Sequence, residues 1–342
     1  MYSSRELYRH TRNYNCRIRE FDYRGLKHIK LENELIKIVV VVDKGADITE
    51  FVYKPLDVDF LWHCFSGLKD PAKDIFTIPY PGGVFLDYYE GGWQEIFPNI
   101  NTPANYKGAP LGIHGEVDTI KWSAAVIKDE PEEVSVKFSV RTLRTPYKLE
   151  RTLTLKTYDP TLYIEESVTN EGMNEEQFMW AHHPALGPVF LDETCEIEFA
   201  KGATAQVMAP GALVNGEKFI WPNAPLNEGG ILDVSKVRPP EDKRYVEYAV
   251  TGGGGGYKIF NNGLGLGFGM QWDEEIFKYT WVWEPCCSND GYPWYGRNYV
   301  LGIEPWSHVP PDMEAMVNND EGIHIGPGKT ITTKMKAFAF TR

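Results

Sequence analysis

The sequence predicts an all-β fold, in which mostly antiparallel strands form a large sandwich with few short helices. Alternation of apolar and polar residues dominates over helical spacing, as in residues 134–141, where Val134, Val136 and Phe138 fall on one face and polar side chains on the other. The 32 Gly and 23 Pro supply turns between many short segments of this kind. Both observations favour an antiparallel sandwich over a βαβ fold.

Further segments share this strand pattern and are bounded by Gly, Pro, Asn or Asp. They are Leu149–Thr157, Leu162–Thr169, Tyr245–Thr251, Phe277–Trp283 and Ile331–Phe340. The best helix candidate is Ser4–Arg12. The run Gly252–Gly256 is interpreted as a hairpin turn, because no Lys-Ser/Thr follows it as in a phosphate-binding loop. In residues 263–269 glycine alternates with apolar residues, which predicts a strand with one bare face and a close neighbour.

The sequence predicts that residues 1–342 form a single domain. No linker composition and no internal repeat interrupts the strand pattern. The stretches richest in Gly and Pro, which are Pro79–Gly92, Pro103–Gly112 and Pro285–Gly296, flank the chemically interesting residues. We therefore expect them to be loops of a functional site.

The charge of the chain restricts its partners. A formal net charge of −13 and a pI near 5.2 argue against nucleic acid and anionic membranes, which are held mainly by Lys and Arg. No apolar run comes near the length of a membrane helix, which needs about 20 residues, and the first residues lack the apolar core of a signal peptide. The five cysteines show no repeated spacing and are interpreted as free thiols in a reducing compartment. The prediction is a cytoplasmic protein; the oligomeric state is left open.

Three short motifs place an ionisable side chain inside an otherwise apolar or turn-forming stretch. They contain His114, His183 and Glu304. Glu304 ends an apolar strand-like run, and burial of a carboxylate there requires a partner or a raised pKa, which makes it a candidate general base. By itself the pattern fits a carboxylate that caps backbone amides equally well. His183 precedes a proline, which favours extended backbone and an imidazole at a strand end.

The His182-His183 doublet leaves the assignment of one histidine open. In a strand the two side chains point to opposite faces, so one of them at most is catalytic. The conceivable ligands of a metal ion are His114, one member of the doublet and Glu304. Their spacings are not typical of a zinc site, so the sequence predicts no metal.

The order of these motifs resembles the aldose 1-epimerase (galactose mutarotase) superfamily. The resemblance lies in the segments 113–115 (Ile-His-Gly), 183–187 (His-Pro-Ala-Leu-Gly) and 303–305 (Ile-Glu-Pro), together with the all-β pattern. It implies a galactose mutarotase-like β-supersandwich with the site in a cleft on its concave face. It also implies that Glu304 is the general base, that His183 is the general acid, that His114 binds the sugar, and that no cofactor is needed.

The chain departs from that family at two sugar contacts. The family's Asn-Arg pair before the first histidine is replaced here by the segment 91–99, and no Gly-Tyr-Asp-His segment occurs within 244–269. These departures put galactose itself in doubt as the substrate. Planar polar and aromatic side chains hold sugars, so we expect substitute contacts. The candidates for sugar binding are His182, Trp93, Gln94, Glu95, Asn99, Trp283, Arg297 and Trp306.

The function predicted from these residues is interconversion of the α and β anomers of an unusual free aldose or related sugar. A carboxylate and an imidazole suit this chemistry, because one takes the proton of the C1 hydroxyl while the other protonates the ring oxygen. Two alternatives are a non-catalytic carbohydrate-binding protein on the same fold, and a glycan-cleaving enzyme that pairs Glu304 with Glu284 or Glu95. A small-molecule sugar is the expected partner, and the absence of an Arg or Lys cluster near the motifs disfavours a sugar phosphate.

Overall fold

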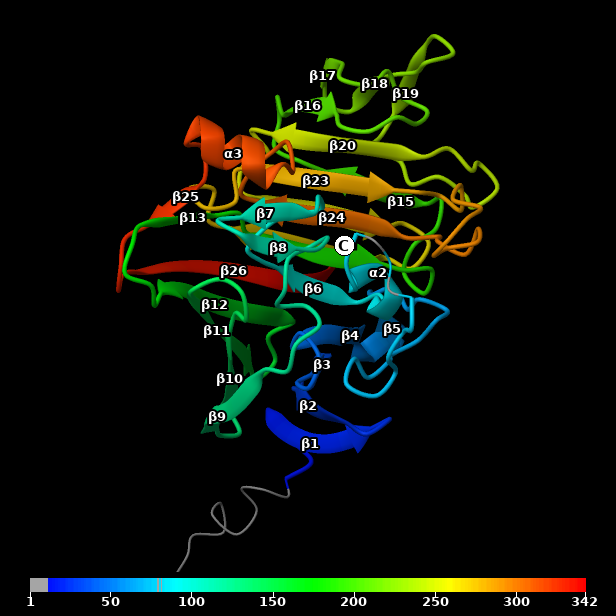
Figure 1. Cartoon of the computed structure of the whole chain (residues 1–342). Coiled ribbons are helices and arrows are strands. Elements are labelled where there is room, and N and C mark those ends of the chain that lie inside the picture. The colour runs from blue at the N-terminus through cyan, green and yellow to red at the C-terminus, as the bar shows by residue number, and fades with distance from the viewer. Residues whose placement is uncertain (1–11, 79, 81) are drawn as a thin grey trace, which may run out of the picture.

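A computed structural model describes residues 12–78, 80 and 82–342 and contains two large β-sheets (Figure 1). Neighbouring strands pair antiparallel in both sheets. The larger sheet has 12 strands in the order β1 (Arg17–Tyr23), β2 (Leu26–Glu32), β3 (Ile36–Val41), β4 (Asp47–Tyr53), β6 (Trp93–Ile96), β14 (Ala181–Leu186), β24 (Leu301–Trp306), β23 (Tyr279–Glu284), β20 (Val246–Thr251), β16 (Thr204–Val207) and β17 (Lys218–Ile220), with β5 (Val58–Asp59) paired to β4.

The second sheet and the minor elements complete the architecture. The 8-stranded sheet has the order β15 (Cys195–Glu198), β21 (Gly256–Asn261), β22 (Leu266–Trp272), β26 (Thr330–Thr341), β12 (Thr161–Asn170), β11 (Tyr147–Lys156), β10 (Glu133–Arg141) and β9 (Ser123–Asp129). Two-stranded sheets pair β13 (Glu176–Phe178) with β25 (Ile323–Ile325), β18 (Asn223–Pro225) with β19 (Ile231–Asp233), and β7 (Ala104–Tyr106) with β8 (Ala109–Leu111). The helices are short: η1 (Lys54–Leu56), α2 (Phe85–Tyr88) and α3 (Met313–Asn319).

The hydrophobic core lies between the two large sheets and is built by alternating side chains. In β11 every second residue from Tyr147 to Leu155 is buried, and the apolar side chains among them join a cluster with strands of the larger sheet. Gly267 and Gly269 leave room for aromatic rings of β26, since a Cβ atom at Gly267 would lie 2.2 Å from Phe340 Cζ and one at Gly269 would lie 2.6 Å from Phe338 Cζ. The predicted close neighbour of the glycine-alternating strand is therefore confirmed.

The predicted strands are confirmed, and one turn is corrected. Segments predicted at 149–157, 162–169, 245–251, 277–283 and 331–340 correspond to β11, β12, β20, β23 and β26. The run Gly252–Gly256 is not a hairpin, because β20 belongs to the larger sheet and β21 to the smaller one, so the run carries the chain from one layer to the other. The helix predicted at Ser4–Arg12 lies outside the described residues except for Arg12. In the described part of the chain, no helix has the length and apolar character to cross a membrane.

Strand β14 crosses the middle of the larger sheet between β6 and β24 (Figure 1). In its register with β6, His182 is opposite Glu95 and His183 is opposite Gln94. Because alternate side chains point to opposite faces of a strand, this register sends the two histidines to opposite sides of the sheet.

Candidate active site

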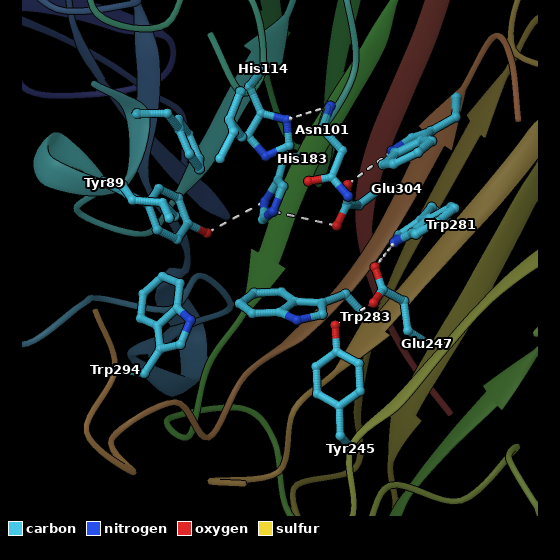
Figure 2. Close-up of a pocket in the computed structure, with 14 residues that line it drawn as sticks. Tyr89, Asn101, His114, His183, Tyr245, Glu247, Trp281, Trp283, Trp294 and Glu304 are labelled. Carbon is cyan, nitrogen blue, oxygen red and sulfur yellow. Dashed lines mark hydrogen bonds and ion pairs between the residues drawn. The ribbon is translucent and has the colours of Figure 1, made fainter. Parts of the chain in front are cut away.

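A cavity of about 200 Å³ opens over β14, β24, β23 and β20 and is the setting of the candidate site (Figure 2). Loops that contain α2 and residues 101, 113, 114 and 294 close its sides. The cavity is lined by Phe85, Leu86, Tyr89, Asn101, Ile113, His114, His183, Tyr245, Glu247, Trp281, Trp283, Trp294, Glu304 and Trp306. Of the sequence-predicted site residues, Glu304, His183, His114, Trp283 and Trp306 are brought together here.

Glu304 is presented by β24, and two neighbours on the strand make its position possible. A Cβ atom at Gly302 would lie 2.5 Å from Glu304 Oε1, so the glycine leaves the space that the carboxyl group occupies. Trp306 donates a hydrogen bond from Nε1 to Glu304 Oε2 at 2.9 Å. These contacts hold Glu304 Oε2 against the Trp306 indole, and Oε1 faces the cavity.

His183 stands beside Glu304 on the neighbouring strand β14. Its Nε2 lies 3.5 Å from Glu304 Oε1, and Tyr89 Oη lies 3.4 Å from its Nδ1. Figure 2 shows the imidazole between the Tyr89 hydroxyl and the Glu304 carboxyl. The imidazole and the Glu304 carboxyl group therefore lie side by side at the cavity.

Burial sets the protonation of this pair. It raises the pKa of Glu304 well above the usual value, against the stabilising hydrogen bond from Trp306, and the charge of Glu247 adds to the rise. Burial also lowers the pKa of His183 to about 4. Desolvation disfavours both charged forms, so burial favours a protonated Glu304 beside a neutral His183.

His114 reaches the cavity from a tight turn. Its backbone φ is 62°, and a Cβ atom on the following Gly115 would lie 2.0 Å from the Phe97 carbonyl oxygen, so glycine is required there. The Asn101 backbone N–H donates to His114 Nδ1 at 3.3 Å. Since Nδ1 accepts, the neutral ring carries its proton on Nε2. The His114 and His183 ring centroids are 5.5 Å apart.

A second carboxylate, Glu247 on β20, also lines the cavity, and the sequence analysis missed it. Trp281 Nε1 donates to its Oε1 at 2.9 Å, and the Tyr245 hydroxyl donates to its Oε2. Burial raises its pKa, against these two hydrogen bonds. The signal was present, because Glu247 interrupts an otherwise apolar strand in the same way as Glu304.

Aromatic rings form most of the cavity wall. Trp281 and Trp306 stack with centroids 4.1 Å apart, and Trp283 lies 5.7 Å from the His183 ring. Trp294 and Tyr89 come from the Gly- and Pro-rich segments 285–296 and 79–92, which the sequence analysis interpreted as loops of a site. Such rings match the C–H faces of a sugar.

Three predicted sugar contacts lie instead on the inner face of the sheet, in a buried network between the two layers. His182 Nε2 contacts Glu166 Oε2 at 2.9 Å, and its Nδ1 accepts from Trp93 Nε1 at 3.2 Å. Glu95 accepts from Trp180 Nε1 at 3.0 Å and pairs with Arg151 at 3.4 Å. These partners hold His182, Trp93 and Glu95 away from the cavity.

The remaining predicted contacts also lie outside the cavity. Gln94 donates to the Gly91 carbonyl, and Asn99 donates to the carbonyls of Thr102 and Gly112. Arg297 is exposed and lies 4.6 Å above the Phe65 ring. Of the carboxylates considered as partners of Glu304 in glycan cleavage, Glu95 lies in the inner network and Glu284 pairs with Arg238 at 3.0 Å.

The acidic and imidazole side chains in the described lining of the cavity are those of Glu247, Glu304, His114 and His183. No Lys or Arg occurs among the described residues that line it. Within residues 12–78, 80 and 82–342, no three His, Cys, Asp or Glu side chains form a group that could hold a metal ion. The arrangement thus offers acid–base chemistry and hydroxyl recognition in an aromatic, cation-free pocket.

A family profile described as Domain of unknown function (DUF4432) matches residues 23–338. The chain belongs to this family. The DUF4432 profile covers every residue of the candidate site and both large sheets, except for most of β1 and the end of β26. No curated protein sequence matches the chain.

Solved structures identify the fold of this DUF4432 chain. A galactose mutarotase-like protein from Clostridium acetobutylicum has a TM-score of 0.63 at 16% identity, over 96% of this chain and 99% of that one. A galactose mutarotase related enzyme from Lactobacillus acidophilus has a TM-score of 0.60 at 15% identity, over 94% and 98%. Slr1438 from Synechocystis sp. PCC 6803 has a TM-score of 0.64 at 15% identity, over 95% and 96%. The predicted galactose mutarotase-like all-β fold is confirmed.

Proposed function

We propose that this protein is an aldose 1-epimerase-type isomerase, which interconverts the α and β anomers of an uncharged free sugar. The observation that carries the proposal is the Glu304–His183 pair, 3.5 Å apart in an aromatic cavity that holds no Lys or Arg among its described lining residues. The similarity of fold to galactose mutarotase-like proteins supports the same class of chemistry.

The reaction needs one proton shared by the pair. One member accepts the proton of the C1 hydroxyl while the other donates a proton to the ring oxygen, and the C1–O5 bond breaks to leave an open-chain aldehyde. After rotation about C1–C2, the group that took the C1 proton gives it to the carbonyl oxygen, and the other group takes back the proton of the O5 hydroxyl as the ring closes on the other face. A Glu304–His183 pair with one proton contains one acid and one base wherever the proton resides, and each group contributes about 10²–10⁴-fold.

The other lining residues suit recognition of a neutral ring. Glu247 keeps lone pairs for sugar hydroxyls after it accepts from Trp281 and Tyr245, and His114 Nε2–H is a donor. A phosphate or carboxylate on the ring would meet two carboxylates and no counter-charge from a Lys or Arg in the described lining. We therefore assign the site to sugars without an anionic group.

The test is saturation-transfer NMR of anomer exchange in a panel of neutral aldoses, with wild type, Glu304→Gln and His183→Asn. We expect wild type to accelerate exchange for at least one sugar and each variant to lose about 10²–10⁴-fold. Binding without acceleration for any sugar would favour a carbohydrate-binding protein. Release of a free sugar from a glycoside would favour glycan cleavage.

A further inference from the structure

A second cavity of about 190 Å³ adjoins the candidate active site. The two cavities share Leu86, Tyr89 and Trp294 in their walls. Trp294 lies 5.8 Å from Trp283 and 5.8 Å from Tyr89, measured between ring centroids. Figure 2 shows Trp294 and Tyr89 at the side of the active-site cavity opposite Glu247. Leu86, Tyr89 and Trp294 therefore form the wall between the two cavities, and a ligand that occupies both must pass along these side chains.

The second cavity is bordered by aromatic rings that remain open to solvent. We call it the aromatic groove; beyond the shared residues it is lined chiefly by Phe65, Phe76, Tyr292 and Tyr295. The exposed fractions are 47% for Phe65, 47% for Tyr292 and 62% for Tyr295. Single exposed aromatics are ordinary on a protein surface, but several around one cavity beside a candidate active site indicate a binding surface.

The charged side chains that line the groove, Asp87 and Lys69, both have hydrogen-bond partners in the protein. The Tyr292 hydroxyl and the Tyr80 backbone N–H donate to the Asp87 carboxylate, and Lys69 Nζ donates to the Asp87 carbonyl at 2.7 Å. The groove therefore presents ring faces and hydroxyl groups beside one ammonium and one carboxylate group, and the Arg297 guanidinium lies 4.6 Å from the centroid of the Phe65 ring. This chemistry suits a second uncharged sugar ring, whose C–H face packs on aromatic rings.

We propose that the substrate is a reducing disaccharide or longer saccharide, whose reducing-end ring occupies the active-site cavity and whose next ring occupies the aromatic groove. This inference rests on the proposed anomer chemistry. That chemistry requires a free C1 hydroxyl on the reacting ring, so the second ring is linked through another hydroxyl.

The experiment compares kcat/KM for anomer exchange of reducing disaccharides of several linkages with that of their constituent monosaccharides. The groove variants are Phe65→Ala and Tyr295→Asn. Tyr158→Asn is the matched control, because Tyr295 and Tyr158 are exposed tyrosines with φ of 49° and 54°, a conformation that asparagine tolerates. Tyr158 lines neither cavity.

We expect wild type to prefer at least one disaccharide over its monosaccharide by about tenfold, as about 1.4 kcal/mol of added binding would give. Phe65→Ala and Tyr295→Asn should remove that preference and leave monosaccharide exchange unchanged, and Tyr158→Asn should change neither. Equal use of both sugar classes, or equal loss for both in the groove variants, overturns the inference. If the groove instead binds an apolar substituent or a protein segment, wild type will show no preference for a disaccharide, and this result also overturns the inference.

A second measurement distinguishes failure of the proposed anomer chemistry from failure of the groove proposal. If no sugar of either class exchanges faster than in buffer, anomer catalysis fails, and saturation-difference NMR of binding then tests the groove. Disaccharide binding that weakens in Phe65→Ala but not in Tyr158→Asn would support the groove as a sugar subsite. Absence of disaccharide binding would overturn it.

Discussion

His182 and His183 are consecutive residues with opposite surroundings, and each contacts a buried glutamate. His182 faces the space between the sheets, where Glu166, Glu95, Trp93 and Arg151 form a network. His183 faces the cavity, where Glu304 is its acidic neighbour at 3.5 Å. A histidine–glutamate pair thus occurs on each face of the sheet. The pair on the inner face is enclosed by protein partners, and the pair at the cavity is open to a ligand. The open pair is the one available for chemistry.

Electrostatics differ between the two faces in a corresponding way. Burial raises the pKa of Glu95 to about 7 and that of Glu166 to about 8, and the Arg151 guanidinium opposes both shifts. In the cavity, Glu304 has an indole N–H and no cation among the described lining residues. In the inner network, Arg151 therefore offsets the negative charge of the glutamates. In the cavity, only protonation or a bound ligand can offset the charge of Glu304.

The largest expected effect comes from exchanging the two histidines for asparagine one at a time. His183→Asn should lower kcat by about 10²–10⁴-fold with little change in the free energy of unfolding, because it removes one proton carrier. His182→Asn should lower the free energy of unfolding by about 1–3 kcal/mol, since Glu166 and the Trp93 N–H lose partners. Anomer-exchange rates and urea unfolding measure the two effects. A large loss of kcat with unchanged stability in His182→Asn would reverse the assignment.

Arg151→Met tests whether the inner network is closed by its cation. We expect a destabilisation of about 3–5 kcal/mol in urea unfolding, because two buried carboxylates lose their counter-charge. Arg141→Met is the control, since Arg141 pairs with Glu171 at the exposed surface, where a pair contributes about 0–1 kcal/mol. Equal effects of the two substitutions would contradict a structural role for Arg151.

Gly302→Ala tests the fit of the Glu304 carboxyl group. The new Cβ atom would lie 2.5 Å from Oε1 in the present position, so the carboxyl must move. A displacement of this kind lowers kcat by about 10²-fold. Gly326→Ala provides the comparison, because its Cβ atom would meet only Lys329 Cγ at an ordinary 3.5 Å. Unchanged kcat in Gly302→Ala would show that this carboxyl position is not required.

The smallest effect is expected in the pH profile. Activity should fall as pH falls through the His183 pKa of about 4, because protonation of both groups removes the base. It should also fall at high pH, when Glu304 loses the shared proton. Trp306→Phe removes the N–H that stabilises the ionised carboxylate, so it should raise the pKa of Glu304 and move the alkaline limb upward. The acid limb should stay in place; movement of the acid limb alone would contradict this assignment.

The sequence by itself predicted several of the strands and singled out Glu304, His183 and His114. Strand alternation at 134–141 and 149–157 depends on local burial, which any half-buried strand reveals in its own residues. The three motif residues were recognisable because an ionisable side chain stands out in an apolar stretch. The same reasoning applied to β20 would have found Glu247.

Only the tertiary structure decided which neighbours share a cavity. Gln94 is opposite His183 in the register, yet its amide turns to a backbone carbonyl. Trp93 and Glu95 fall on the inner face because side chains alternate across β6. Trp294 and Tyr89 meet although about 200 residues of chain separate them. A sequence specifies the side chains that can do chemistry, whereas pairing between distant strands determines which of them face the same space.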